Sequence, residues 1–251
     1  MNHTIEQDIL TFCRRFQNEP WFEGLFWGGS SRFRPVTENT DVDLFIIAND
    51  SLPKRIHGLH RFNGTMMEYF VNPLSRIETQ MQNEIAWIHD YWVIKIYAFA
   101  KILLDKNGQA AKLQALANQR FQQPFSPNDP DTELSNYSRV WDCYTDYLEL
   151  CRLGHNAEPM YYETLKAILH AYCYQHQTPL IPWNKCQQLL QDVAYRTNYH
   201  LKCLPDQDFC AVFSRCLEAP PADRALLLGE LYDTVLKQSG FSPEDYIQTK
   251  S

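Results

Sequence analysis

The chain has 251 residues, of which 45% are hydrophobic, and a formal net charge of −7 at pH 7. This length accommodates one or two domains with a sizeable core, and the apolar content is typical of a soluble globular protein. The apolar runs are shorter than the ~18–20 residues that a membrane span needs, so no membrane partner is expected.

The N-terminal stretch and the cysteines indicate the compartment. "MNHTIEQDILTFCRRF" lacks the basic-then-apolar pattern of a signal peptide and has the spacing of an amphipathic helix. The eight cysteines include no CxxC pair, and several lie inside helical patterns. Reduced, buried thiols and a cytoplasmic location are therefore expected.

The charge is unevenly distributed along the chain. Residues 1–130 carry 14 acidic and 13 basic side chains, whereas residues 131–251 carry 16 acidic and 10 basic ones. An acidic second half argues against nucleic acid as a partner, because phosphate contacts need a basic surface. It is compatible with a cationic ligand, although a solvated acidic surface is the commoner explanation of such a bias.

The first half of the chain has a mixed pattern. Residues 4–18 have the apolar spacing of a helix, and helices dominate again after Pro73. Asn63-Gly64 is a dipeptide favoured in tight hairpin turns, because both positions accept positive φ. Strands are predicted by apolar and β-branched runs that end at 26–28 and cover 41–48, 55–61, 65–71 and 101–104.

A loop-like stretch divides the chain near residue 123. "QQPFSPNDPDTE" is rich in proline, asparagine and aspartate, which is the composition of a loop. Beyond it, only helical periodicity is present, over 132–152, 159–176, 184–197, 206–217 and 222–238. The sequence predicts an α+β protein, in which an N-terminal domain over 1–122 with a small mixed sheet precedes an all-helical domain over 131–251.

The segment "GGSSRFRPVTENTDVDLFII" carries the strongest chemical signal. Side chains alternate along a strand, so Asp41 and Asp43 point to the same side and repel each other unless a cation lies between them. Such oxygen ligands suit Mg²⁺. Glu68, at the centre of a predicted hairpin strand, is the candidate third ligand, which a second metal ion requires. Upstream, Gly28-Gly29-Ser30 allows a phosphate to approach backbone N–H groups.

This segment resembles the polymerase-β-like nucleotidyltransferase superfamily, whose signature is Gly-Ser, a variable stretch and then Asp-x-Asp on a strand. Ser30 precedes Asp41 by eleven positions, a usual spacing in that superfamily, and Thr40 occupies a place often taken by serine. "MEYFVNP" and "KILLDKNG" are similar to small bacterial members, a group that includes antibiotic nucleotidyltransferases. Arg34 departs from the pattern, since many members have glycine there.

The resemblance implies a nucleotidyltransferase catalytic domain followed by a helical domain that binds the acceptor. It implies ATP as co-substrate, two Mg²⁺ ions, and transfer of a nucleoside monophosphate, AMP in the first instance, to a hydroxyl of a small molecule such as an aminoglycoside-like antibiotic. The implied catalytic and metal-binding residues are Asp41, Asp43 and Glu68. The implied nucleotide-binding residues are Gly28, Gly29, Ser30 and Arg32, of which Arg32 is equally well read as a solvated loop arginine.

In the helical half, Asp142, Asp146 and Glu149 are spaced by four and three residues and therefore share a helix face. Such a row is most often solvated. In antibiotic-modifying relatives, however, a carboxylate of the helical domain faces the acceptor hydroxyl and acts as the base. These three residues, together with Lys166 as a phosphate contact, are the acceptor-side candidates.

Two other functions remain open. A toxin–antitoxin-type regulatory transferase adenylylates a partner protein that carries an Arg-x₄₋₆-His motif on a helix. The helical half here has no such motif, and Arg55–His60 has the spacing but falls in the hairpin, so the partner would be a separate chain. A binding module that keeps the fold without catalysis is the third candidate, against which the presence of all three carboxylates argues.

Overall fold

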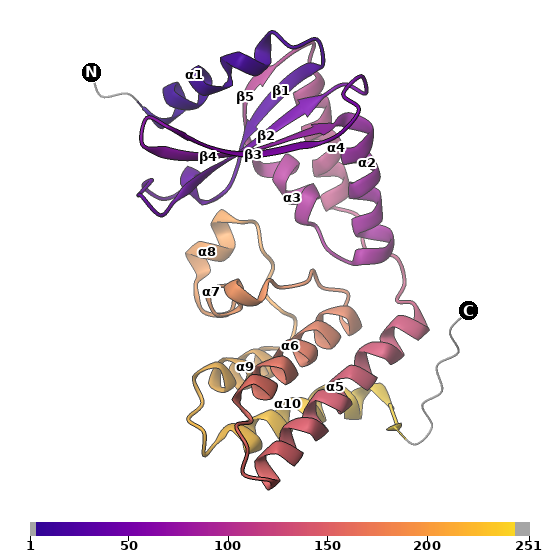
Figure 1. Cartoon of the computed structure of the whole chain (residues 1–251). Helices are drawn as coiled ribbons and strands as arrows, with labels where there is room; N and C mark the ends of the chain where they lie inside the picture. The colour runs from indigo at the N-terminus through magenta and orange to yellow at the C-terminus, as the bar shows by residue number, and fades with distance from the viewer. Residues whose placement is uncertain (1–3, 244–251) are drawn as a thin grey trace. The chain divides into compact units, whose positions relative to one another are not determined.

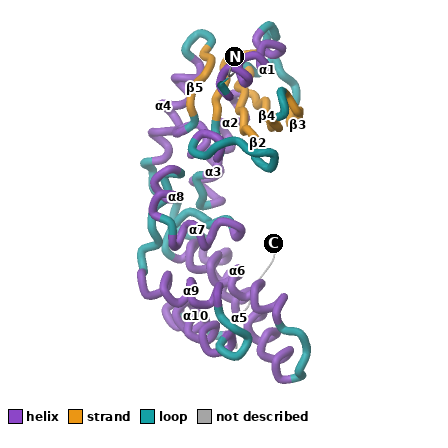
Figure 2. The backbone as a smooth tube through the Cα atoms, turned by 90° about the vertical axis from the view of Figure 1, so that its left-hand side faces the viewer, coloured by secondary structure: helices purple, strands orange, loops and turns teal. Residues whose placement is uncertain are grey.

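The computed structural model describes residues 4–243, and the chain divides into two compact units, Met1–Phe125 and Ser126–Ser251. The strands belong to the first unit, and the described part of the second consists of helices and loops (Figure 2). The predicted α+β class is confirmed, with a mixed sheet flanked by helices followed by a helical C-terminal part. The functional roles expected of the two parts stay predictions.

The sheet of the first unit has five strands in the spatial order β3-β4-β2-β1-β5 (Figure 1). Its strands are β1 (Phe22–Trp27), β2 (Asp41–Ala48), β3 (Ile56–Phe62), β4 (Thr65–Pro73) and β5 (Lys101–Asp105). β2 and β4 are parallel, and the other neighbouring pairs are antiparallel. Asn63 (φ 48°) and Gly64 (φ 84°) join β3 to β4 with the two positive φ angles of a two-residue hairpin turn, so the predicted hairpin is confirmed.

Helices cover both faces of this sheet (Figure 1). They are α1 (Ile5–Gln17), α2 (Leu74–Asn83), α3 (Trp92–Phe99) and α4 (Gln109–Phe121), with a π-helical turn η2 (Glu84–Ile88) between α2 and α3. α1 packs through Ile9 and Phe12 on the face that buries Val42 and Leu44 of β2. α2, α3 and α4 pack on the opposite face, which buries Ile47. The polar start of β2 belongs to neither apolar cluster.

The second unit is built from α-helices around an aromatic-rich core. They are α5 (Pro130–Arg152), α6 (Glu158–Gln175), α7 (Cys186–Gln191), α8 (Val193–Asn198), α9 (Gln207–Glu218) and α10 (Arg224–Ser239). The hydrophobic face of α6 lies at the centre of this core, where Tyr161 and Tyr172 are buried. The ring of Tyr172 stacks on Phe209 of α9 with centroids 3.7 Å apart.

The single helix predicted over 184–197 is wrong. The structure has a short 3₁₀ turn η3 (Trp183–Lys185) and then α7 and α8, which are separated at Asp192. Asp192 has an extended backbone, and its carboxylate accepts a hydrogen bond from the Tyr195 backbone N–H (2.9 Å). A side chain that caps a new helix competes with continuation of the preceding one, because it satisfies a backbone donor at the helix start.

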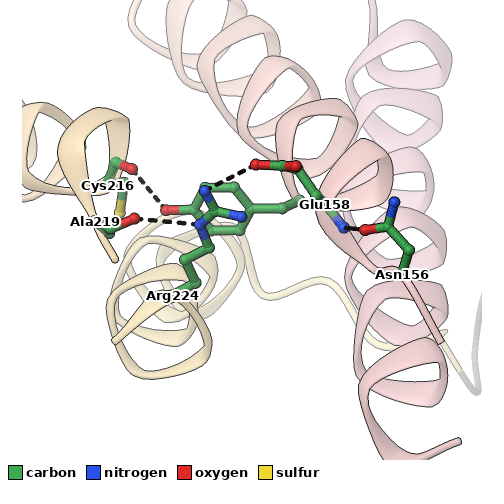
Figure 3. Close-up of polar contacts among 6 residues, drawn as sticks. Asn156, Glu158, Cys216, Ala219 and Arg224 are labelled. Atoms are coloured by element: carbon green, nitrogen blue, oxygen red, sulfur yellow. Dashed lines mark hydrogen bonds and ion pairs between the residues drawn. The ribbon is translucent and has the colours of Figure 1, made fainter. Parts of the chain in front are cut away.

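An arginine at the start of α10 holds three helices of the second unit together (Figure 3). Arg224 donates from Nε to the carbonyl oxygen of Ala219 (3.2 Å) and from Nη2 to the carboxylate of Glu158 (3.0 Å). Its guanidinium lies 4.9 Å from the ring centroid of Tyr161, whose hydroxyl donates to the carbonyl oxygen of Cys216 (2.7 Å). The beginnings of α6 and α10 are thereby fixed to the end of α9.

The cysteines and the hydropathy of the helices bear on two further expectations. All eight cysteines are free thiols, but the expected burial holds for only four of them: Cys143 and Cys210 are half-buried, and Cys151 and Cys203 are exposed. Among residues 4–243, none of the helices combines the length and the apolar character that crossing a bilayer requires.

Candidate active site

The parallel pairing of β2 with β4 brings the three predicted carboxylates together. Asp43 is the register partner of Glu68, and Asp41 lies two residues earlier on the same side of β2. Each residue offers one carboxylate oxygen, and the three oxygens lie within 4.8 Å of one another. Two neighbouring strands therefore present three oxygen ligands at one point on the sheet.

The electrostatics of this cluster favour a cation. Burial and then the neighbouring charges of Asp41 and Glu68 raise the pKa of Asp43 from its ordinary 3.8 to about 6. A carboxylate in this position is destabilised in its charged form, and a bound divalent cation would reverse the repulsion. Clustered hard oxygen donors of this kind are the ligands that Mg²⁺ prefers, so the residues present fit the ion that the sequence resemblance implies.

Gly29 is required by the position of the Asp43 side chain. Its backbone (φ 67°, ψ −171°) lies in a region that is essentially restricted to glycine. A Cβ atom on Gly29 would stand 1.7 Å from Oδ2 of Asp43. The preceding residue is also tied to this strand, because Gly28 donates its N–H to the Asp43 carbonyl oxygen (3.0 Å). The glycines were predicted to admit a phosphate, and the structure adds that Gly29 admits the Asp43 carboxylate.

We therefore expect Gly29→Ala to destabilise the fold by more than the ~1–3 kcal/mol of backbone strain alone, because the carboxylate of Asp43 must also move. Urea unfolding measures the change. Gly154→Ala is the control for an added Cβ at positive φ, since Gly154 has a similar φ of 69° but has no atom within 4 Å of an added Cβ. Equal losses of stability in the two variants would contradict the close approach of Asp43.

The two serines after Gly29 have different environments. They begin the 3₁₀ turn η1 (Ser30–Arg32). Ser31 is buried and accepts a hydrogen bond from the Trp27 indole N–H (3.0 Å). The Ser30 hydroxyl is half-buried and has no hydrogen-bond partner within residues 4–243. Ser30 is therefore the serine whose hydroxyl is available to a ligand.

Arg32 is only partly available for the predicted phosphate contact. One guanidinium nitrogen, Nη1, donates to the carbonyl oxygen of Phe99 at the end of α3. Burial lowers the pKa of the Arg32 guanidinium from its ordinary value. Arg32 is therefore not a solvated loop arginine, but among the described residues only one of its guanidinium nitrogens is hydrogen-bonded to the protein. A contact between Arg32 and a nucleotide stays a prediction. Arg34, the departure from the superfamily pattern, is exposed.

His57 is a residue of this site that the sequence analysis missed. Its Nε2 lies 2.7 Å from Oε1 of Glu68. A signal was present in the sequence, because the two-residue turn sets the hairpin register. That register pairs Leu59 with Glu68 and His57 with Phe70. His57 is therefore a diagonal neighbour of Glu68 on the same face, within reach of a long side chain.

The acceptor-side candidates lie on α5 and α6 of the second unit. Asp142 and Asp146 are exposed, and among the described residues their carboxylates form no ion pair. Glu149 is also exposed, but it accepts two hydrogen bonds from Arg152 (2.6 and 2.7 Å). Lys166 pairs with Glu163 of its own helix (2.6 Å). An acceptor-side role for any of the four stays a prediction.

Comparison with known proteins supports the fold and leaves the family unassigned. The chain is similar to the crystal structure of a nucleotidyltransferase-like protein from Exiguobacterium sibiricum 255-15, with a TM-score of 0.51 and 14% sequence identity. The similarity covers 94% of this chain and 76% of that one. No family model and no curated protein matches the chain. The protein thus has a nucleotidyltransferase-like fold, and its acidic cluster is consistent with nucleotidyl transfer in general.

Proposed function

We propose that this protein is a Mg²⁺-dependent nucleotidyltransferase that moves AMP from ATP to a hydroxyl of a small-molecule acceptor. The observation that carries the proposal is the convergence of the Asp41, Asp43 and Glu68 carboxylates within 4.8 Å. The three carboxylates lie beside Gly29, whose backbone passes so close to the Asp43 side chain that a Cβ atom would not fit. Burial, together with the charges of Asp41 and Glu68, raises the pKa of Asp43 to about 6. Such a cluster is costly to keep, and a metal-dependent function explains why it is kept.

Each part of the site has a role in this proposal. Asp41, Asp43 and Glu68 would hold two Mg²⁺ ions, which neutralise the triphosphate and lower the pKa of the attacking hydroxyl. The hydroxyl of Ser30 binds a phosphate oxygen. Phosphoryl-group chemistry depends mainly on positioning and charge stabilisation, and residues on two paired strands provide rigid positions.

ATP binding should depend on Ser30. We expect Ser30→Ala to weaken the binding of a non-hydrolysable ATP analogue by about 1.5–3 kcal/mol, the contribution of one hydrogen bond to a charged group. Calorimetry measures the affinity. Ser31→Ala is the control, because it removes the buried partner of Trp27 and should lower stability without changing ATP affinity. Unchanged affinity in Ser30→Ala would remove Ser30 from the nucleotide site.

For the acceptor, we propose a small cation such as an aminoglycoside. The second half of the chain holds the excess of negative charge, and α5 carries the exposed carboxylates of Asp142 and Asp146. Ammonium groups on the acceptor would be attracted by this charge, and the attraction would weaken as salt is added. One of the α5 carboxylates would take the proton of the attacking hydroxyl.

A transfer assay tests the proposal. Purified protein is incubated with Mg²⁺, ATP labelled in the α-phosphate, and pools of aminoglycosides, lincosamides and nucleosides. We expect release of pyrophosphate and label on one acceptor, both abolished by EDTA. Label on an added candidate partner protein, with none on small molecules, would favour the toxin–antitoxin-type alternative. Absence of transfer to either class, together with no binding of Mg²⁺ or ATP, would overturn the proposed function.

A further inference from the structure

We infer that His57 is a positioning residue for Glu68, and that its imidazole holds the carboxylate in the orientation that the metal site requires. The inference rests on the proposed function, since it concerns the third metal ligand. His57 belongs to β3, the edge strand of the sheet, and Glu68 belongs to β4 beside it. Nε2 of His57 lies 2.7 Å from Oε1 of Glu68, a good distance for a charge-assisted hydrogen bond.

The imidazole ring is fixed by an aromatic row that runs across three strands. It stacks on Phe70 of β4 with centroids 4.5 Å apart and an interplanar angle of 5°. Phe70 in turn stacks on Phe45 of β2, with centroids 5.4 Å apart and an angle of 11°. The row starts at the sheet edge and ends on the strand that carries Asp41 and Asp43. The direction of the Nε2–H bond is therefore set by packing.

The backbone of β3 also packs closely against a β4 side chain next to His57. A Cβ on Gly58, the residue after His57, would stand 2.3 Å from the Tyr69 ring. Tyr69 packs on Phe12 and Phe16 of α1, with ring centroids 5.8 and 5.3 Å away. The helix on the far face of the sheet thus supports the position of β3 next to His57.

The chemistry of the pair assigns the donor and the acceptor. An ionised carboxylate only accepts hydrogen bonds, so His57 carries hydrogen on Nε2 and donates to Glu68. Within the described residues the metal-binding cluster consists of the three carboxylates, so His57 acts through Glu68. A glutamate has several rotatable bonds, and holding it before an ion arrives removes part of the entropy cost of binding.

An exposed ion pair without further role is the alternative, since the His57 side chain is 43% exposed. Two substitutions separate the two explanations. His57→Phe keeps a ring to stack on Phe70 and removes the donor. His57→Gln removes the ring and keeps a donor at the same distance along the side chain. His60→Phe is the matched control, because His60 lies on β3 but faces Phe12, with ring centroids 5.5 Å apart.

The main measurement is Mn²⁺ binding by the full chain, followed by electron paramagnetic resonance. Loss of a partner that orients a metal ligand typically weakens metal binding by about 10- to 100-fold. We expect a loss of this size in His57→Phe, substantial recovery in His57→Gln, and wild-type affinity in His60→Phe. The Mg²⁺ concentration needed for half-maximal transfer should rise in parallel in His57→Phe.

These measurements distinguish a failure of the positioning role of His57 from a failure of the proposed function. Wild-type Mn²⁺ affinity in His57→Phe would overturn the positioning role while leaving the proposed function standing. Failure of the wild-type protein to bind Mn²⁺ would overturn both. Nitrogen NMR of the wild-type imidazole decides the matter if His57→Phe does not fold. A hydrogen on Nε2 coupled to Glu68 supports the inference, and a ring with Nε2 unprotonated contradicts it.

Discussion

Replacing Asp43 by asparagine is expected to abolish nucleotidyl transfer and, at the same time, to make the metal-free protein more stable. Transfer is lost because one of the three carboxylates that would hold the proposed metal ions is removed. Stability rises because asparagine keeps the shape of the side chain without the charge that burial, Asp41 and Glu68 make costly. At ~1.4 kcal/mol per pKa unit, the expected gain in the free energy of unfolding at pH 7–8 is about 2–3 kcal/mol.

The dependence on pH has a definite sign. The pKa of Asp43 is raised to about 6 in the folded protein, so between pH 4 and 6 the folded state binds more protons than the unfolded state. The contribution of Asp43 to the free energy of unfolding therefore falls as pH rises from 4 to 6. Well above pH 6 the ionised Asp43 carboxylate destabilises the folded state by the full amount. In Asp43→Asn this decrease should be absent.

Urea unfolding in EDTA at several pH values measures both effects. Glu38→Gln is the control, because Glu38 is an exposed loop carboxylate outside the cluster. Saturating Mg²⁺ should narrow or reverse the difference between wild type and Asp43→Asn, since an ion that binds the folded state stabilises it. A clear loss of stability in metal-free Asp43→Asn would indicate that the charge of Asp43 is needed for the fold.

The second large effect is a loss of turnover, expected when a carboxylate on α5 is substituted. If an α5 carboxylate is the general base, its replacement should reduce turnover by about 10²- to 10⁴-fold and leave ATP affinity unchanged. The structure ranks the three candidates. Glu149 is engaged by Arg152, which holds the pKa of Glu149 below its ordinary value, and a weaker base is a poorer proton acceptor. We therefore expect Asp142→Asn or Asp146→Asn to have the larger effect.

Turnover and ATP affinity are measured separately for Asp142→Asn, Asp146→Asn and Glu149→Gln. Asp208→Asn, which alters an exposed carboxylate of α9, is the control and should behave as wild type. The affinity for the acceptor should also fall with salt. Near-neutral behaviour of all three α5 variants would refute the cationic-acceptor proposal and favour a neutral acceptor.

Local signals in the sequence predicted most of the secondary structure. The hairpin was recognisable because its turn requires two positive φ angles, which Asn63 and Gly64 accept. The strand 41–48 followed from its apolar and β-branched run, and its bounds agree with β2. The predicted helix over 184–197 was wrong although its signal was local, because Asp192 is a capping residue inside an otherwise helical pattern.

The sequence by itself determined that Asp41 and Asp43 share one side of a strand, because side chains alternate along any strand. Only the tertiary structure decided that Glu68 stands beside Asp43. The parallel pairing of β2 with β4 is non-local and is stabilised by the helices that pack on both faces of the sheet. The residue before Gly29, Gly28, is hydrogen-bonded to the same strand, so the role of Gly29 under the Asp43 carboxylate also became visible only in the folded chain.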